Sequence, residues 1–168
     1  MEIRPATVDD VSDVRRIVRS AWDDSYGFLS EREQDVAFEE WYGSDRLEAQ
    51  LRDEDAIFLA SVTDGELVGF AYATTDIDPE RVGESEIRSI YVDPDEWRTG
   101  VGSDLLAAIE DHVSERGFTQ LSAPIFTENE RGRAFFEANG FERIEERVVD
   151  LFTGGTCDAV VYYHQFSK

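Results

Sequence analysis

The sequence is poor in the residues that hold metals or cross-links: it has one cysteine, one methionine and two histidines among 168 residues. A single cysteine, Cys157, cannot form a disulfide within the chain. Cys157, His112 and His164 lack the spacing of zinc ligands, so we expect no metal site. No apolar run approaches the ~18 residues of a membrane span, and the acidic N-terminus is unlike a targeting peptide. We therefore expect a cytoplasmic protein that binds no membrane.

Positive charge is also scarce. The chain has 38 acidic and 16 basic residues, a formal net charge of −22, and every basic residue except Lys168 is arginine. The acids are spread through every segment, which favours adaptation to a salty cytoplasm over an acidic surface that attracts polyamines or basic proteins. No basic stripe with aromatic residues is present, so nucleic-acid binding is not expected. The hydrophobic content of 41% and the length indicate a single folded domain over residues 1–168.

Hydrophobic patterning gives the order of elements as β-α-α-β-β-β-α-β-α-β-β. The predicted strands are EIRPAT, two runs about an Asp64-Gly65 turn, SEIRSIYVDP, QLSAPIF and a final hairpin about Gly154-Gly155. The first predicted helix begins near Val11. The segment 31–52 is predicted as one broken helix or two short ones, and two further helices are predicted over 100–116 and 129–139. Three strands come in direct succession before any crossover helix, so we expect an α/β (α+β) fold with a mixed sheet and not a doubly wound Rossmann sheet.

The segment WRTGVGSDLL, residues 97–106, joins a strand to a helix through two glycines. A nucleotide P-loop would need a lysine, which is absent, and the dinucleotide fingerprint would need glycine where Leu105 stands. The third kind of phosphate loop with this setting is the pyrophosphate loop of acyl-CoA N-acyltransferases. Gly100 and Gly102 would let the backbone approach an anion, which the unpaired N–H groups of a helix start bind.

Two segments resemble motifs of the GNAT superfamily of acyl-CoA N-acyltransferases. IYVDPDEWRTGVGSDLL resembles motif A, and NERGRAFFEANGFER at 129–143 resembles motif B. The resemblance implies a mostly antiparallel central sheet of about seven strands flanked by about four helices. It also implies transfer of an acetyl group from acetyl-CoA to a primary amine by direct attack. The acceptor, a small-molecule or peptide amine, and a homodimer are left open by the sequence.

The same resemblance implies which residues form the site. The coenzyme A site would consist of Ile90, Tyr91, Val92, Trp97, Arg98, Thr99, Gly100, Val101, Gly102, Ser103, Asn129, Arg133 and Phe136. On the acceptor side, Glu86 would be the general base, and Trp22 and Tyr26 would contact the substrate. Asn129, Arg133 and Phe136 are spaced to share one helix face, which would point toward the coenzyme.

The sequence departs from the family pattern at two positions. Trp97 stands where motif A usually has glutamine or arginine, with Arg98 beside it as a candidate phosphate contact. Phe136 stands where motif B usually has the tyrosine that protonates the departing thiolate, and a phenyl ring cannot donate a proton. We expect a lower intrinsic rate or a substitute donor, for which Tyr26, Tyr91 and Tyr162 are candidates and Tyr91 is the one assigned. The alternative is an acyl-CoA-binding regulatory or sensor module that has lost efficient catalysis.

Overall fold

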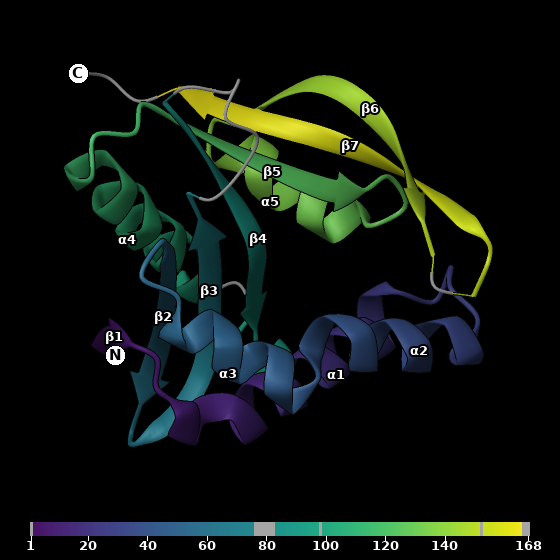
Figure 1. Cartoon of the computed structure of the whole chain (residues 1–168), viewed down its shortest axis with the longest axis horizontal. Coiled ribbons are helices and arrows are strands. Elements are labelled where there is room, and N and C mark those ends of the chain that lie inside the picture. Colours follow the sequence, from purple (N-terminus) through teal and green to yellow (C-terminus); the bar gives the residue numbers. More distant parts are fainter. Residues whose placement is uncertain (1, 76–82, 98, 152, 166–168) are drawn as a thin grey trace.

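A computed structural model describes residues 2–75, 83–97, 99–151 and 153–165. One sheet has the order β1-β2-β3-β4-β5-β7-β6 (Figure 1), in which β4 and β5 are parallel and the other neighbours antiparallel. The strands are β1 (Glu2–Pro5), β2 (Ala56–Thr63), β3 (Glu66–Thr74), β4 (Glu84–Val92), β5 (Gln120–Phe126), β6 (Glu142–Asp150) and β7 (Thr156–Gln165). The predicted mixed, mostly antiparallel sheet is confirmed.

The helices also follow the predicted order. They are η1 (Val8–Asp10), α1 (Val11–Ser25), α2 (Glu31–Tyr42), α3 (Ser44–Arg52), η2 (Pro94–Glu96), α4 (Val101–Glu115) and α5 (Glu130–Ala138). The segment 31–52 is therefore two helices, and the break is at Gly43, whose extended backbone (φ −63°, ψ 151°) separates them. The Asp64-Gly65 turn has positive φ at both residues, 54° and 80°, as a two-residue hairpin turn with the twist of the strands requires.

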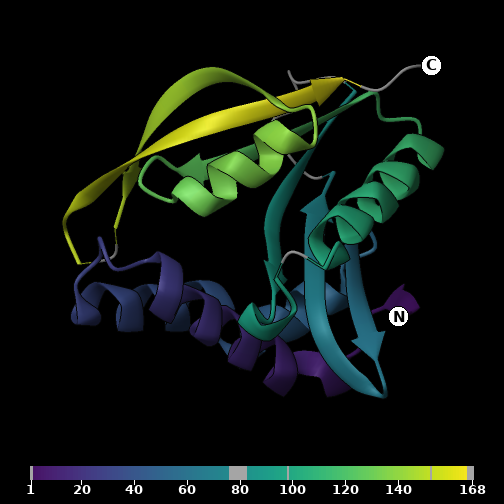
Figure 2. The same ribbon diagram turned by 180° about the vertical axis from the view of Figure 1, so that it is seen from behind.

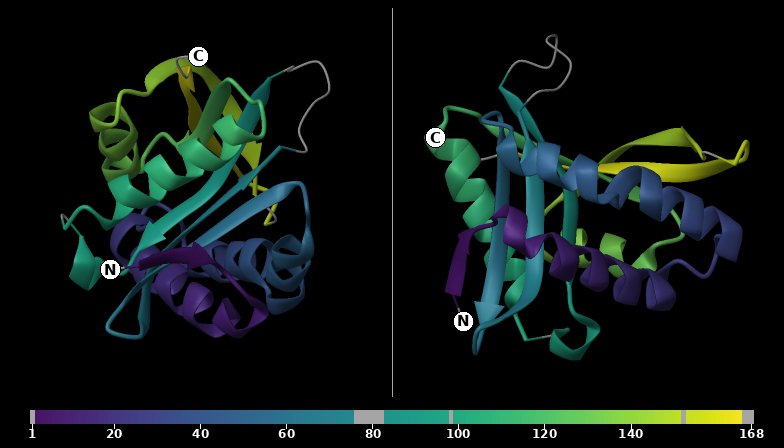
Figure 3. Two further views of the ribbon diagram at one scale, coloured as in Figure 1. Left: turned by 90° about the vertical axis from the view of Figure 1, so that its left-hand side faces the viewer. Right: turned by 60° about the horizontal axis from the view of Figure 1, so that its bottom comes forward.

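The helices cover the two faces of the sheet in two separate groups. Helices α1–α3 pack on one face, where Trp22, Phe38 and Phe70 belong to one buried cluster. Helices α4 and α5 pack on the other face, where Leu105, Ile109 and other aliphatic side chains form a second cluster. Figure 2 shows α4 and α5 from behind, and the right panel of Figure 3 shows α1–α3 crossing the opposite face. Side chains alternate along each strand, so β2, β3, β4, β5 and β7 contribute to both clusters.

The sheet opens between its two central strands. The register of β4 and β5 joins Glu84 to Gln120, Ser85 to Leu121 and Glu86 to Ser122, and then ends. Beyond this point β4 continues along β3, while β5 continues along β7 (Figure 1). The register of β3 and β4 shifts opposite Arg88, which is left without a partner residue on β3. This irregularity bends β4 away from β5 and leaves backbone and side chains of both strands facing a common space.

Candidate functional site

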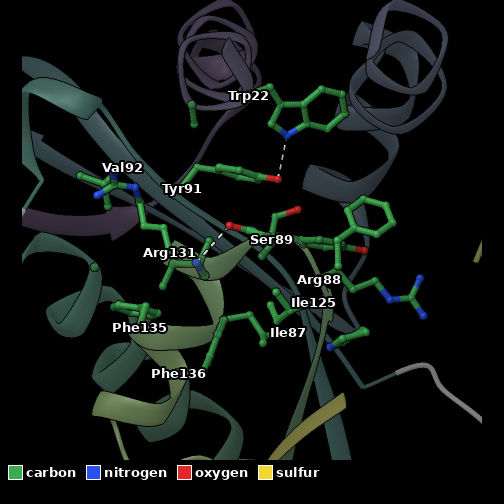
Figure 4. A pocket seen from close by; sticks show the side chains of 18 of the residues that line it. Trp22, Ile87, Arg88, Ser89, Tyr91, Val92, Ile125, Arg131, Phe135 and Phe136 are labelled. Carbon is green, nitrogen blue, oxygen red and sulfur yellow. Dashed lines mark hydrogen bonds between the residues drawn. The ribbon is translucent and has the colours of Figure 1, made fainter. Parts of the chain in front are cut away.

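A cavity of about 1080 Å³ lies where β4 and β5 diverge. Its walls come from segments that are far apart in the sequence: β4, the first turn of α4, the end of β5, the start of α5, and helices α1–α3. Figure 4 shows this cavity, with Trp22 and Tyr91 facing each other, Arg131 reaching toward Val92, and Arg88 extending at the other end of the strand. The lining changes in character from one end to the other.

One end is formed by backbone at the start of α4. Gly100 has φ 90°, a left-handed conformation that favours glycine, and a Cβ built there would meet no atom within 4 Å. The first helical hydrogen bond runs from Asp104 N to Gly100 O at 3.0 Å. The N–H groups of Val101, Gly102 and Ser103 therefore have no carbonyl one turn earlier within the helix, and these residues line the cavity. Together with the helix dipole, they form a cradle suited to an anion such as a pyrophosphate.

Gly102 has a second structural role. A Cβ at this position would lie 3.0 Å from Cε1 of Phe135 and 3.7 Å from Cγ2 of Val92. The missing side chain thus lets the ring of Phe135, on α5, rest against the first turn of α4. Glycine is required at the two positions for different reasons. At Gly100 it allows the left-handed backbone conformation, whereas at Gly102 the absence of a side chain leaves room for the Phe135 ring.

Trp97 and Arg131 complete this part of the cavity. The indole Nε1 of Trp97 donates to the carbonyl oxygen of Val92 at 2.8 Å, and the guanidinium carbon of Arg131 lies 3.9 Å from the centroid of the Trp97 ring. The cation–π contact holds a positive charge beside the cradle. We call Trp97, Gly100–Ser103, Arg131 and Phe135 the loop end of the cavity. Sequence reasoning did not single out Arg131, because motif B carries no fixed residue type there.

The motif B residues are divided between the cavity and its surroundings. The side-chain Oδ1 of Asn129 accepts from Gly132 N at 3.0 Å, which caps α5, and Asn129 also hydrogen-bonds Tyr26. Phe136 lines the cavity but is only 1% exposed, because Phe135 and Phe141 each pack edge-on to it at 5.1 Å.

Arg133 is not among the described residues that line the cavity, and its Nε donates to the Thr127 carbonyl oxygen at 2.8 Å. Thr99 does not line it either; its hydroxyl donates to Glu96 O. Ile90 and Val92 do line it, and Arg98 lies outside the described residues.

The opposite end is formed by aromatic side chains. They are Trp22 from α1, Tyr26 directly after that helix, Trp41 and Tyr42 from α2, Tyr91 from β4 and Phe126 from β5, which we call the aromatic end. Trp22 Nε1 donates to the Tyr91 hydroxyl at 2.9 Å, and the Tyr26 hydroxyl lies 3.4 Å from that of Tyr91. The structure therefore brings Trp22, Tyr26 and Tyr91 together, although they were assigned to two different partners from the sequence.

Two tyrosines of the aromatic end, Tyr26 and Tyr42, stay protonated. Burial raises the pKa of Tyr26 well above its usual range, with a further contribution from the neighbouring Tyr91. Burial likewise raises the pKa of Tyr42, whose hydroxyl lies 2.7 Å from the Ser89 hydroxyl. A neutral hydroxyl keeps its proton available for donation, so this end can supply protons but carries little charge of its own.

Charged side chains meet the aromatic end where β4 leaves β5. Glu86, which is 7% exposed, lines the cavity and accepts from Arg88 Nε at 2.9 Å. Arg46 and Gln50, from α3, line the same cavity. Sequence reasoning identified Glu86 but missed Arg46, Gln50, Trp41, Tyr42 and Phe126. Nothing local in the sequence marks these residues, since their proximity arises only from the packing of α2, α3 and β5 around β4.

The described part of the chain lacks two kinds of feature. There, no three or more His, Cys, Asp or Glu side chains are grouped so that they could hold a metal ion. None of the helices described is both long and apolar enough to cross a membrane.

Comparison with known proteins gives consistent results. A family model described as "Acetyltransferase (GNAT) family" matches residues 14–141. An aminoglycoside N(6′)-acetyltransferase type 1 of Stenotrophomonas maltophilia is 32% identical over 151 residues, which cover 88% of this chain and 89% of that protein. An uncharacterized N-acetyltransferase of Archaeoglobus fulgidus is 28% identical over 150 residues, covering 86% of this chain and 95% of that protein.

Solved structures share the fold. The crystal structure of the PaiA N-acetyltransferase of Thermoplasma acidophilum, in complex with coenzyme A, superposes with a TM-score of 0.82 over 98% of both chains. The two sequences are 21% identical, so this likeness bears on the fold alone.

Proposed function

This chain belongs to the acetyltransferase (GNAT) family and is an N-acetyltransferase, and on that premise we propose that it moves an acetyl group from acetyl-CoA to a primary amine by direct transfer. In this proposal residues 1–168 form one catalytic domain, and the acceptor is a small molecule or a peptide. The observation that carries the proposal is one cavity with an anion cradle at the loop end and a buried carboxylate beside neutral tyrosines at the aromatic end.

The loop end is suited to hold coenzyme A. Its pyrophosphate would accept hydrogen bonds from the N–H groups of residues 101–103, and Arg131 on the ring of Trp97 would add a positive charge. Backbone groups of Ile90, Tyr91 and Val92 would pair with the pantetheine as an added strand does, except that the Val92 carbonyl already accepts from Trp97. Coenzyme A in the Thermoplasma PaiA structure supports this assignment.

The aromatic end is suited to manage protons. Acetyl-CoA supplies an activated thioester, and transfer forms a C–N bond to the amine while the C–S bond breaks. The amine must lose a proton, and Glu86, in the cavity wall, is the proposed acceptor of that proton. The sulfur must gain one, and the Tyr91 hydroxyl is the proposed donor, since Trp22 donates to its oxygen and thereby leaves its proton for another partner. Phe136 takes no part in proton transfer.

Membership of the family does not favour the alternative of a regulatory module without catalysis. We propose a cytoplasmic enzyme whose acidic composition suits high salt, because screening weakens the self-repulsion of a net charge of −22.

The proposed function is tested by presenting purified protein with acetyl-CoA and a broad panel of primary amines at high salt. The measured quantities are release of the coenzyme A thiol and formation of the N-acetyl product. We expect stoichiometric appearance of both with at least one amine. Lack of thiol release across the panel, with acetyl-CoA binding shown by calorimetry, would contradict catalysis and leave only the binding module.

A further inference from the structure

The charges around the aromatic end differ from those of the rest of the molecule. Acids outnumber bases by more than two to one in the sequence. Among the described residues, however, the carboxylates that line the cavity are those of Glu86, Glu96 and Glu130. Glu96 and Glu130 immediately precede Trp97 and Arg131 of the loop end in the sequence, so Glu86 is the carboxylate beside the aromatic end. A polycationic acceptor would need several carboxylates here.

Two arginines gather at the aromatic end instead. Arg46 and Arg88 both line the cavity, and both are exposed at its mouth. Both flank the same tyrosine: Arg46 acts electrostatically on Tyr42, and the Tyr42 hydroxyl lies 2.7 Å from that of Ser89, the residue after Arg88. Arg46 makes no ion pair with the described part of the chain, so its guanidinium is available to an anion.

The ion pair between Glu86 and Arg88 places two opposite charges side by side. Arg88 uses its Nε for Glu86, at 2.9 Å, which leaves its two terminal nitrogens for another acceptor. A carboxylate that binds an amine therefore lies next to a guanidinium that can bind a carboxylate. An amine and a carboxylate attached to the same carbon atom, as in an α-amino acid, match this arrangement. Around them, the rings of Trp41 and Phe126, with centroids 6.0 Å apart, offer an apolar surface to a side chain.

We propose that the acceptor is an amino acid with an apolar or aromatic side chain. Its amine lies toward Glu86, its carboxylate between Arg46 and Arg88, and its side chain against the aromatic end. This assignment rests on the proposed function and narrows its substrate class. It predicts that a free carboxylate is required, and that polyamines and other polycations are poor acceptors.

The decisive comparison is between an amino acid and its carboxamide. L-Phenylalanine and L-phenylalaninamide, and L-leucine and L-leucinamide, have the same side chain and differ in the carboxylate. An α-amino group beside an amide has a pKa near 7.7–8.0, so more of it is neutral, and simple reactivity favours the amide. We expect kcat/KM to be at least about tenfold higher for the acids. A hydrogen bond between a guanidinium and a carboxylate contributes more free energy than a tenfold ratio requires.

The variant Arg46→Gln should lower the ratio of acid to amide kcat/KM about tenfold. Arg52→Gln is the matched control, because Arg52 lies on the same helix, pairs with Glu48 and does not line the cavity. A preference for the amides or for spermidine, or turnover of simple amines alone, overturns the amino-acid assignment but leaves the N-acetyltransferase intact. A ratio unchanged by Arg46→Gln overturns the role of Arg46. Absence of turnover with every amine, despite acetyl-CoA binding, refutes the proposed function itself.

Discussion

The two ends of the cavity are built in different ways. At the loop end, the binding groups are backbone amides of a continuous segment, Gly100–Ser103, held by one left-handed residue and by the close approach of Phe135. At the aromatic end and beside it, the groups are side chains from α1, α2, α3, β4 and β5 that meet only in the folded protein. If the proposed function holds, local backbone geometry binds the co-substrate, whereas the residues that select the acceptor are distributed over the fold.

The largest effect is expected at the centre of the aromatic end. Trp22 is 1% exposed, stacks on Tyr26 at 4.9 Å and donates to Tyr91. Trp22→Ala should lower the free energy of unfolding by about 3–5 kcal/mol, because it removes a large buried ring and leaves a cavity. Urea denaturation measures this cost. Trp22→Phe, which keeps much of the packing, should lose far less, and equal losses in the two variants would show that packing is not the cause.

The next largest effect is expected on the rate of acetyl transfer and not on the binding of acetyl-CoA. Tyr91→Phe should lower kcat about 10²-fold, because it removes the proposed general acid. This is the low end of the usual loss, since a thiol pKa near 8.5 makes the thiolate a tolerable leaving group without protonation. KM for acetyl-CoA should stay nearly constant in steady-state assays. Tyr163→Phe, on β7 and away from the cavity lining, is the control. A kcat within threefold of the unmodified enzyme would remove Tyr91 from the reaction.

A smaller effect is expected at the loop end. Gly102→Ala should destabilise the fold by about 1 kcal/mol, because its Cβ would crowd the Phe135 ring and force a shift of a few tenths of an ångström. The affinity for acetyl-CoA, measured by calorimetry, should fall together with the stability of the fold. The double variant Gly102→Ala, Phe135→Leu should recover affinity by giving the methyl group room. If the second change brings no recovery, the glycine serves the coenzyme directly and not the packing of α5.

The smallest effect is long-range and concerns salt. Coenzyme A is polyanionic and the protein has a net charge of −22, so their repulsion should fade as the Debye length falls to ~3 Å at 1 M salt. The apparent affinity for acetyl-CoA should therefore rise modestly with salt in a titration. A monotonic fall would mean that local contacts such as those of Arg131 dominate over the net charge.

Sequence patterns were sufficient for the glycine segment of the loop end because its determinants are local. The strand, the two glycines and the helix of WRTGVGSDLL follow one another in the chain, and the structure keeps them in that relation. A 3.6-residue repeat of apolar residues likewise predicts the buried side of α4, where Val101, Leu105, Ile109 and Val113 are all buried. The stacking of Arg131 on Trp97 was not readable, because it joins two motifs through space.

The sequence carries much less information about the aromatic end. Trp22 and Tyr26 were expected near the acceptor only from a resemblance, and their contact with Tyr91 spans more than sixty residues of sequence. Arg46 and Arg88 line the same space because the β4 register shifts at Arg88 and because α3 forms part of the same cavity wall. Such groupings depend on tertiary packing, for which the spacing of residues along the chain carries no signal.

A structure of the protein with acetyl-CoA bound tests the central claim, that the two ends of one cavity divide donor from acceptor. The account predicts the pyrophosphate on the N–H groups of residues 101–103, beside Arg131, and the thioester between β4 and β5, facing Tyr91 and Glu86. A pyrophosphate bound away from the start of α4, or a thioester buried on the α4 face without access to Tyr91, would contradict it.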